Sequence, residues 1–160
     1  MWTVVDSPIG PLRIVEQNGA ITAIEFSPFR DQDGRPRGVQ ADDDPVLRAT
    51  ADQLAEYFAG ERTDFDLPLA PVGSAWQRSV WEQLLKIGYG ETASYGEIAA
   101  RLGKTNAASR AVGTANGSNP IPIVIPCHRV IGADGTLTGY AGGIERKQLL
   151  LDLERTDQLF

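Results

Sequence analysis

The chain is 160 residues long, 42 % of them hydrophobic, and carries a formal net charge of −6, which suits one ordinary domain or two small ones. It shows no run of roughly 18 apolar residues and no basic-then-apolar start, so we expect a cytoplasmic protein without a membrane partner. A single cysteine and a single histidine exclude an internal disulfide and a four-ligand Cys/His zinc site, and we expect no metal and no cofactor.

The first strands are expected between residues 3 and 27, where short apolar stretches are separated by turn residues. Asn18-Gly19 is a strong hairpin pair, because both central positions of the tight turn need a positive φ. Residues 28–45 are rich in Asp, Gly, Pro and Arg, a composition typical of a mobile polar loop. This stretch therefore predicts two or three strands followed by a long loop.

An amphipathic helix is predicted from Pro45, which suits a first helical position, to Gly60, which ends it. Beyond it, Phe65, Leu67 and Leu69 alternate in the manner of one more strand. The pattern predicts a small α/β domain over residues 1–72, and nothing in it suggests chemistry.

A linker over residues 71–74 leads into a second domain, residues 73–160, that is predicted to be mostly helical. The first helix of this domain should end near Gly88. Its predicted apolar face consists of Trp76, Val80, Leu84 and Leu85.

Two short helices should follow. Ser94 is a suitable N-cap for a helix over residues 95–102, with Glu97 completing a capping box. Gly103 ends this helix, and a third helix is expected over residues 106–116. Two short helices joined by a tight Gly-containing turn predict a helix-turn-helix, so the fold class is α+β with a winged-helix-like second domain.

The excess of negative over positive charge lies in the first half of the chain. Residues 1–72 contain 6 Lys and Arg against 13 Asp and Glu, whereas residues 73–160 contain 9 against 8. Because basic surface supplies most non-specific affinity for DNA, any nucleic-acid contact is expected in the second half.

Cys127 and His128, the only residues of their types, are adjacent and follow an apolar run bounded by prolines. A lone cysteine is most often an inert buried residue. Here the neighbouring imidazole provides a base that could form the nucleophilic thiolate. Adjacent side chains of an extended chain point to opposite faces, so the pair needs a turn or a bridging water, and it suits a cysteine hydrolase equally well.

Glu154 lies at the end of a last helix predicted over residues 144–154, on the same stripe as Lys147, Leu150 and Leu151. One interpretation is an exposed glutamate at a frayed helix end. The other is a buried carboxylate that orients His128 in a Cys-His-Glu relay.

The third helix, Ala107 to Gly117, is built from small residues around a single long side chain, Arg110. Such a helix can approach a nucleic acid closely and insert the arginine, or it can pack internally with one surface arginine.

Residues 139–143 hold three glycines and Tyr140, which suits either a loop lining a flat pocket or a simple connection.

Several blocks together resemble one family. Asn119-Pro120, Pro126-Cys127-His128-Arg129-Val130 and Gly139-Tyr140-Ala141-Gly142-Gly143 precede a helix ending in Glu154. Tyr95-Gly96-Glu97-Ile98-Ala99 and Ser109-Arg110-Ala111-Val112-Gly113 come before them in the expected order. The chain is thereby identified as similar to the O6-alkylguanine-DNA alkyltransferases.

The resemblance implies a fold and a reaction. The first domain would be a small ribonuclease-H-like α/β domain, and the second would carry the helix-turn-helix. Cys127 would accept the alkyl group irreversibly and once per molecule, activated by His128 through a water, with Glu154 behind the histidine. Asn119 would hold the turn before the active-site segment, and Tyr95 would help rotate the phosphate and protonate the departing guanine.

The implied partner is double-stranded DNA carrying O6-alkylguanine, bound by a monomer whose cooperativity on DNA is left open. Arg110 would fill the space of the flipped nucleotide. The remaining implied contacts are Tyr95, Gly96, Ala107 and Ser109 to DNA, and Val130, Tyr140 and Ala141 around the guanine.

Two features depart from some relatives: the chain lacks zinc ligands in the first domain, and position 141 is Ala where others have Ser. Two alternatives stay open. One is a DNA-binding regulator that senses alkylation through Cys127, and the other is a Cys-His-Glu hydrolase of esters or peptides, which would leave Arg110 without a purpose.

Overall fold

The computed structural model describes residues 1–158, with side-chain environments as far as Arg155. The chain forms two compact units, Met1–Pro71 and Val72–Phe160. Within the described residues, no helix is long and apolar enough to cross a membrane.

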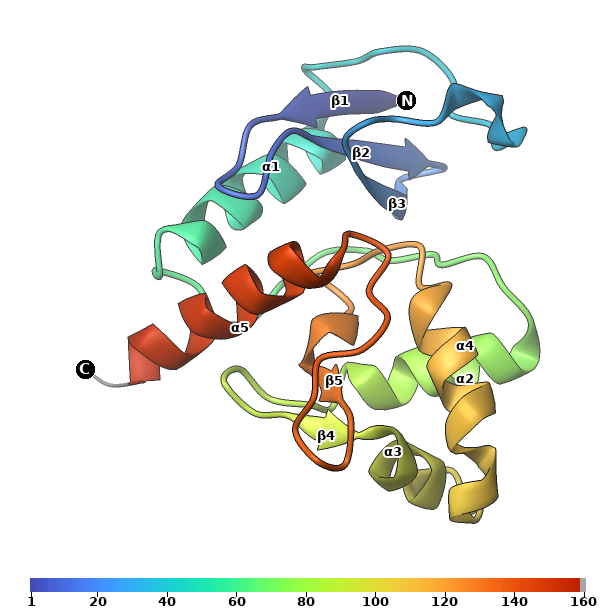
Figure 1. Cartoon of the computed structure of the whole chain (residues 1–160). Helices are drawn as coiled ribbons and strands as arrows, with labels where there is room; N and C mark the ends of the chain where they lie inside the picture. The colour runs from blue at the N-terminus through green and yellow to red at the C-terminus, as the bar shows by residue number, and fades with distance from the viewer. Residues whose placement is uncertain (159–160) are drawn as a thin grey trace. The chain divides into compact units, whose positions relative to one another are not determined.

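The first unit is built on an antiparallel sheet of three strands in the order β1, β2, β3 (Figure 1). The strands comprise β1 (Trp2–Val5), β2 (Leu12–Gln17) and β3 (Ala20–Phe26). Asn18 and Gly19 have φ values of 54° and 83°, as a tight hairpin turn requires. The predicted strands and their turn are confirmed.

One helix, α1 (Pro45–Phe58), packs against this sheet (Figure 1). Asp44 caps it by accepting a hydrogen bond from the Leu47 backbone N–H, and Pro45 occupies the first turn. Burial of Leu47, Leu54 and Tyr57 closes the core of the unit. The predicted helix is confirmed, and Gly60 follows it at a φ of 76°.

The segment predicted as a mobile loop, residues 28–45, has little regular structure but is tied to the sheet by charged side chains. It contains one 3₁₀ turn, Asp31–Asp33. The Glu25 carboxylate accepts hydrogen bonds from Arg13 Nε at 2.8 Å and from Arg37 Nη2 at 2.6 Å, and Arg37 also pairs with Asp33 at 2.7 Å. The side chain of Arg13 is buried and that of Arg37 is largely covered, so the loop is anchored from β2 and β3.

Replacing Glu25 with Gln should lower the free energy of unfolding by roughly 1–3 kcal/mol, because two buried guanidinium groups lose their shared carboxylate. Urea unfolding followed by circular dichroism measures the change. The exposed Glu61 supplies the matched control, and Glu61→Gln should change stability by less than about 0.5 kcal/mol. Equal unfolding curves for Glu25→Gln and the wild type would show that the ion network adds no stability.

The strand predicted from Phe65 to Leu69 is wrong. Only an isolated bridge forms, in which Ile21 donates to the Pro68 carbonyl and accepts from the Ala70 N–H, both at 2.8 Å. The Asp66 backbone is bound instead by the side chain of Gln53 on α1. Proline at position 68 has no N–H for a ladder, and so the alternation does not become a strand.

The second unit begins with α2 (Ala75–Leu84), which starts in a capping box formed by Ser74 and Gln77. It ends about one turn before the predicted Gly88. Leu85, expected on the apolar face, is 50 % exposed, whereas Trp81 is buried and donates its indole N–H to the Ala115 carbonyl at 2.9 Å. The face therefore centres on Trp81, because this hydrogen bond and the packing against α4 fix the rotation of the helix.

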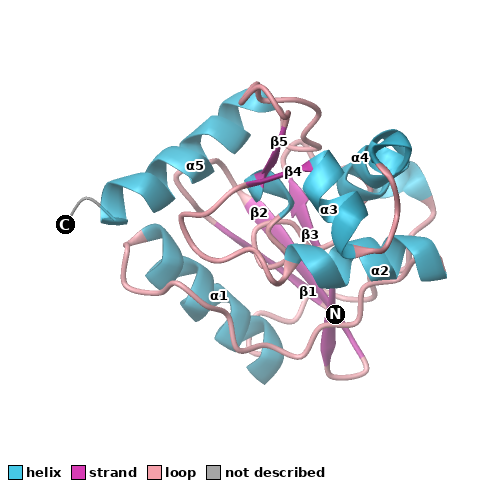
Figure 2. Ribbon diagram, turned by 90° about the horizontal axis from the view of Figure 1, so that it is seen from below, coloured by secondary structure: helices cyan, strands magenta, loops and turns pink. Residues whose placement is uncertain are grey.

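The helix-turn-helix is confirmed. It comprises α3 (Tyr95–Arg101), a 3₁₀ turn (Asn106–Ala108) and α4 (Ser109–Gly117) (Figure 2). Ser94 and Glu97 form the predicted capping box at the start of α3. Gly103 has a φ of 73° between the helices, a backbone region that glycine adopts without strain.

The segment that contains Cys127 and His128 lies between α4 and the last helix in the sequence. A short strand, β5 (Val130–Ile131), pairs in parallel with β4 (Ala93–Ser94) and directly follows a 3₁₀ turn, η3 (Cys127–Arg129). The last helix, α5 (Ile144–Gln158), extends beyond the predicted end at Glu154. The predicted α+β class is confirmed, with a sheet-and-helix first unit and a helical second unit.

Candidate active site

The segment leading to the cysteine is a tight loop closed by Asn119. Its Nδ2 donates to the Ile125 carbonyl at 2.8 Å, and its Oδ1 accepts from the Ile121 N–H at 3.0 Å. The Ile125 N–H donates to the Ile121 carbonyl at 2.9 Å. Ile123, at the apex, has a φ of 74°, which costs a β-branched residue on the order of 1–3 kcal/mol. The hydrogen bonds hold the loop in this strained shape.

Cys127 follows a second tight turn, in which its N–H donates to the Ile125 carbonyl at 2.8 Å across Pro126. Its own carbonyl accepts from Asn116 Nδ2 at 3.3 Å, so α4 contacts the cysteine backbone directly. Burial raises the pKa of the Cys127 thiol to about 11, against opposing effects of a hydrogen bond with Asn119 and the charge of Lys147. The thiol is therefore protonated in the resting protein at neutral pH.

His128 is fully buried and lies in the same 3₁₀ turn, so the alternation of an extended chain does not separate it from Cys127. Its Nε2 is 2.7 Å from Glu154 Oε2. Burial lowers the pKa of His128 more than its contact with Glu154 raises it, so the ring is neutral at pH 7. A neutral ring that donates from Nε2 to the carboxylate leaves Nδ1 as an acceptor, and Nδ1 has no hydrogen-bond partner among the described residues.

Glu154 is also fully buried, so its interpretation as an exposed residue at a frayed helix end is wrong. It forms two hydrogen bonds with the Arg129 guanidinium, at 2.9 and 3.1 Å, and accepts the Gly90 N–H at 3.2 Å. Burial favours a raised pKa, but the hydrogen bonds and charges of His128 and Arg129 outweigh it and hold the pKa of Glu154 at about 2. The carboxylate is thus ionised throughout the neutral range.

Arg129 is a site residue that the sequence did not reveal. Besides its bonds to Glu154, it donates to the Ile87 carbonyl at 2.6 Å, and its guanidinium lies 5.8 Å from the centre of the Tyr89 ring. A buried arginine is costly without an anionic partner. The position of Arg129 directly after His128 was therefore the sequence feature that could have pointed to a buried ion pair at the site.

Lys147 was placed on the stripe with Glu154 but given no role. The structure buries it completely, with Nζ donating to the carbonyls of Val130 at 2.6 Å and Thr138 at 2.9 Å. The sequence feature that could have revealed it was the helical spacing of Lys147 with two leucines on a face expected to be buried. Lysine is almost never fully buried unless its ammonium group has partners.

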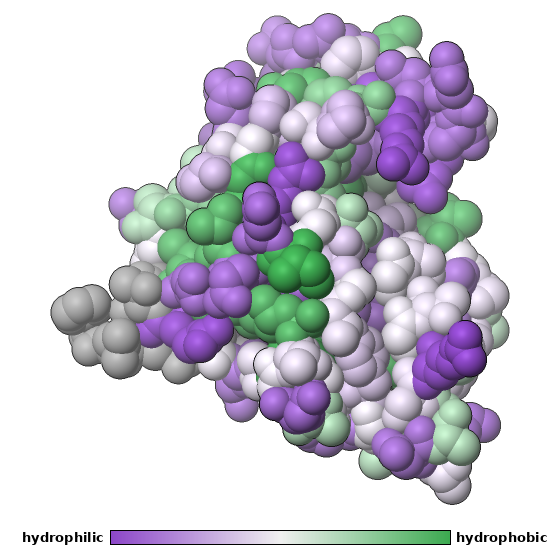
Figure 3. Space-filling model, in the orientation of Figure 1, coloured by the Kyte–Doolittle hydropathy of each residue, from purple (hydrophilic) through white to green (hydrophobic). Residues whose placement is uncertain are grey.

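A shallow hollow of about 470 Å³ lies over the helix-turn-helix. Its lining includes three of the residues expected to contact DNA, and consists of Tyr95, Ser109, Arg110, Gly113, Thr114, Thr138 and Gly139. The Tyr95 hydroxyl is 2.7 Å from Thr138 Oγ1. In Figure 3 the surface over α4 is largely pale, which matches the small Ala, Gly, Ser and Thr residues of this helix.

The other residues expected to contact DNA or guanine are not part of this lining. Gly96 allows the close approach of Asn106, because a Cβ there would lie 2.5 Å from Asn106 Oδ1. Ala107 and Ala141 are exposed, whereas Val130 and Tyr140 are buried.

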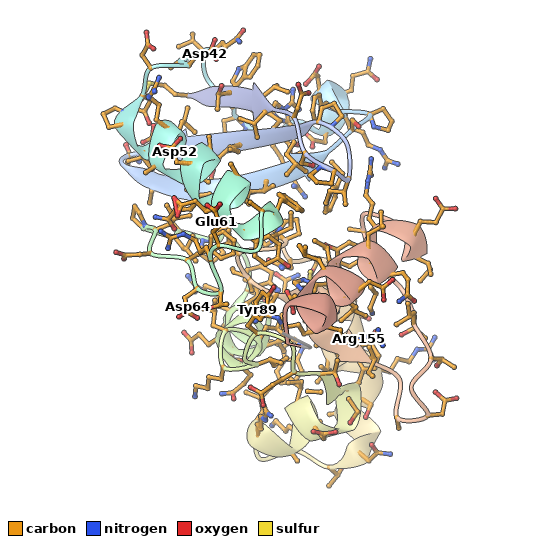
Figure 4. All side chains as sticks on the ribbon, turned by 90° about the vertical axis from the view of Figure 1, so that its left-hand side faces the viewer. Asp42, Asp52, Glu61, Asp64, Tyr89 and Arg155 are labelled. Atoms are coloured by element: carbon orange, nitrogen blue, oxygen red, sulfur yellow. The ribbon has the colours of Figure 1, made fainter. Side chains whose placement is uncertain are left out.

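The first unit carries much of the acidic surface. Asp42, Asp52, Glu61 and Asp64 come from α1 and the segments on either side of it (Figure 4). Among the residues that the structure describes, no group of three or more His, Cys, Asp or Glu side chains is arranged to hold a metal ion.

Family models match both units. Residues 1–71 match the ribonuclease-like domain of 6-O-methylguanine DNA methyltransferase, and residues 75–156 match its DNA binding domain. The chain is 49 % identical over 156 residues to the methylated-DNA–protein-cysteine methyltransferase of Mycobacterium tuberculosis, covering 97 % of this chain and 92 % of that protein. It is 45 % identical over 153 residues to the protein of the same name from Methanosarcina acetivorans, covering 96 % and 97 %.

Solved structures of the same family also resemble this chain in fold. A crystal structure described as Mycobacterium tuberculosis OGT in complex with DNA superposes with a TM-score of 0.87 at 48 % identity, over 98 % of this chain and 93 % of that one. An O6-methylguanine DNA methyltransferase from Methanococcus jannaschii gives a TM-score of 0.69 at 26 % identity, over 96 % and 93 %. The chain belongs to the 6-O-methylguanine DNA methyltransferase family.

Proposed function

We propose that this protein repairs DNA by transferring an alkyl group from O6 of guanine to Cys127, once per molecule. The observation that carries the proposal is the buried arrangement of Cys127, His128 and Glu154 in the unit that holds the helix-turn-helix. The kinship with methylated-DNA–protein-cysteine methyltransferases supports the same reaction.

The relay has a defined direction. The ionised Glu154 accepts a hydrogen bond from the Nε2–H of His128, and the free Nδ1 then accepts the thiol proton through a bridging water. Because the raised pKa of Cys127 keeps the thiol protonated at rest, ionisation belongs to the substrate-bound state. Asn119 keeps the cysteine at the end of the closed loop.

The transfer is a single displacement. The Cys127 sulfur attacks the alkyl carbon, the bond from that carbon to O6 breaks, and its electron pair remains on guanine. The departing guanine receives a proton, which Tyr95 would supply; Tyr95 lines the same hollow as Arg110. The product thioether has no leaving group that would restore the thiol, so the protein is consumed.

Residues 73–160 would carry both DNA binding and chemistry. Ser109, Gly96 and Ala107 would lie against the phosphate backbone, which gives affinity without reading sequence. Arg110, exposed on α4, would fill the gap left by the flipped nucleotide. Val130, Tyr140 and Ala141 would surround the extruded guanine. We propose that the monomer binds duplex DNA in this way.

The test is the mass of the intact protein after incubation with duplex DNA containing one O6-methylguanine. We expect a gain of one methyl group that stops at one per molecule, and no gain for Cys127→Ser. Turnover beyond one methyl per protein would favour a hydrolase. An unmodified protein with an intact lesion would leave a DNA-binding regulator as the function.

A further inference from the structure

Lys147 is a buried cation whose position is fixed. Its side chain is fully buried, and its ammonium donates to the carbonyls of Val130 and Thr138, on β5 and on the loop that precedes α5. These two bonds use two of its three N–H donors. Because both acceptors are backbone atoms, they hold the ammonium without neutralising it.

The charges around this ammonium do not balance in the resting protein. Glu154 and Arg129 neutralise one another through two hydrogen bonds. His128 is neutral, and Lys147 makes no ion pair with a carboxylate among the residues that the structure describes. A buried positive charge without a partner is costly, so a nearby anion would be stabilised.

The anion that the proposed reaction creates is the Cys127 thiolate. The helix that carries Lys147, α5, packs against η3, the turn that begins with Cys127. We infer that Lys147 is the counter-ion of this thiolate, a positioning residue whose fixed ammonium stabilises the ionised sulfur during alkyl transfer.

The pKa values of the two groups support this pairing. The charge of Lys147 lowers the pKa of Cys127, and the thiolate in turn raises the pKa of Lys147, which burial lowers. Once His128 has passed the thiol proton to bulk water, ionisation of Cys127 would leave Glu154 paired with Arg129 and the thiolate paired with Lys147, with His128 neutral. The site would then hold no unbalanced charge.

This inference rests on the proposed function for its meaning, but its test needs no DNA. Methyl iodide serves as the probe: the thiolate attacks its carbon, iodide leaves, and the same Cys127 thioether forms. The rate of the 14-Da mass gain, expected from one added CH₂, is measured from pH 7 to 10 for the wild type and for Lys147→Met, a substitution of similar length without charge.

Lys147→Met should react at least about tenfold more slowly at each pH below the thiol pKa, because an opposite charge nearby shifts a pKa by one unit or more. Lys86→Met, which removes an exposed lysine from the same unit, should react like the wild type. A folded Lys147→Met with the wild-type pH profile would overturn the inference, whatever its activity on methylated DNA.

A second measurement covers the case in which Lys147→Met does not fold. The chain has only three lysines, so their side-chain NMR signals can be assigned and titrated in the intact protein. In the wild type the titration of the Lys147 signals should include a step at the pH where Cys127 ionises, and this step should be absent in Cys127→Ser. An unchanged Lys147 titration would contradict the pairing.

Discussion

Glu154→Gln should lower the free energy of unfolding by about 3–5 kcal/mol and slow alkyl transfer by about 100-fold or more. The amide cannot neutralise the buried guanidinium of Arg129, and breaking a buried pair from one side is among the costliest single substitutions. It also weakens the acceptor that orients His128, and general-base catalysis of this kind contributes at least about 100-fold. Urea unfolding and single-turnover repair of methylated duplex measure the two effects.

A matched control lies on the same helix. Glu145 is exposed in the first turn of α5, and Glu145→Gln should leave both stability and repair rate nearly unchanged. If Glu154→Gln repaired methylated DNA at the wild-type rate, the role of the carboxylate in the relay would be disproved even if stability fell.

The lowered pKa of Glu154 predicts that the folded protein loses stability at acidic pH. Its pKa is about 2 in the folded protein against an ordinary value of 4.5, so the stability it contributes is complete above pH 4.5 and lost as the pH falls toward 2. The loss amounts to about 3 kcal/mol. The lowered pKa of His128 also costs stability on acidification, but that loss begins near its ordinary value of 6.5. Between pH 4.5 and 2, the unfolding free energies of Glu154→Gln and the wild type should therefore converge.

Asn119→Ala should cost about 2–4 kcal/mol of stability and most of the repair activity. It leaves the Ile121 N–H and the Ile125 carbonyl buried without their partner, and an unsatisfied buried group costs about 1–3 kcal/mol. The strained φ of Ile123 then has less to hold it, so Cys127 should no longer be fixed at the end of the loop. Thermal unfolding and the mass gain on methylated DNA report the two losses.

Two further variants separate the contributions of Asn119. Asn119→Asp keeps the acceptor for Ile121 and removes the donor to Ile125, so it should retain part of the stability but place a negative charge beside the forming thiolate. Asn106→Ala removes an exposed asparagine whose Oδ1 accepts a hydrogen bond from Ser109 Oγ, and it should cost less than about 1 kcal/mol. If Asn119→Ala were as stable as the wild type, the hydrogen bonds of Asn119 to Ile121 and Ile125 would not be what holds the loop closed.

The parts of the fold that local chemistry dictates were predictable. The capping box of Ser94 and Glu97, the Asn18-Gly19 turn and the proline at the start of α1 each act within a few residues. The helical spacing of Glu154 with two leucines allowed both a buried and an exposed carboxylate, and it did not decide between them.

The remaining features depend on partners that are distant in sequence. Glu25 anchors Arg37 from 12 residues away, and Arg129 meets Glu154 across 25 residues. Neither pairing leaves a periodic signal, because ion pairs form wherever the fold brings opposite charges together. The strand predicted at Phe65 failed for a related reason, since Gln53 on α1 took the backbone groups of Asp66.

In the loop before Cys127, the structure constrains the number of residues more strongly than their amino-acid identity. Asn119 and Ile121 both close onto Ile125, and the turn across Pro126 begins at that same residue. One residue added or removed between Asn119 and Cys127 would shift these hydrogen bonds out of register with the cysteine, whatever its side chain. The turn at residues 133–136 is also closed by hydrogen bonds, from the Gly132 N–H to the Thr136 carbonyl and from the Gly135 N–H to the Gly132 carbonyl, but its residues are exposed and these bonds do not reach the cysteine segment. Among variants that keep the repair reaction, insertions and deletions should therefore accumulate in that turn and be absent between Asn119 and Cys127.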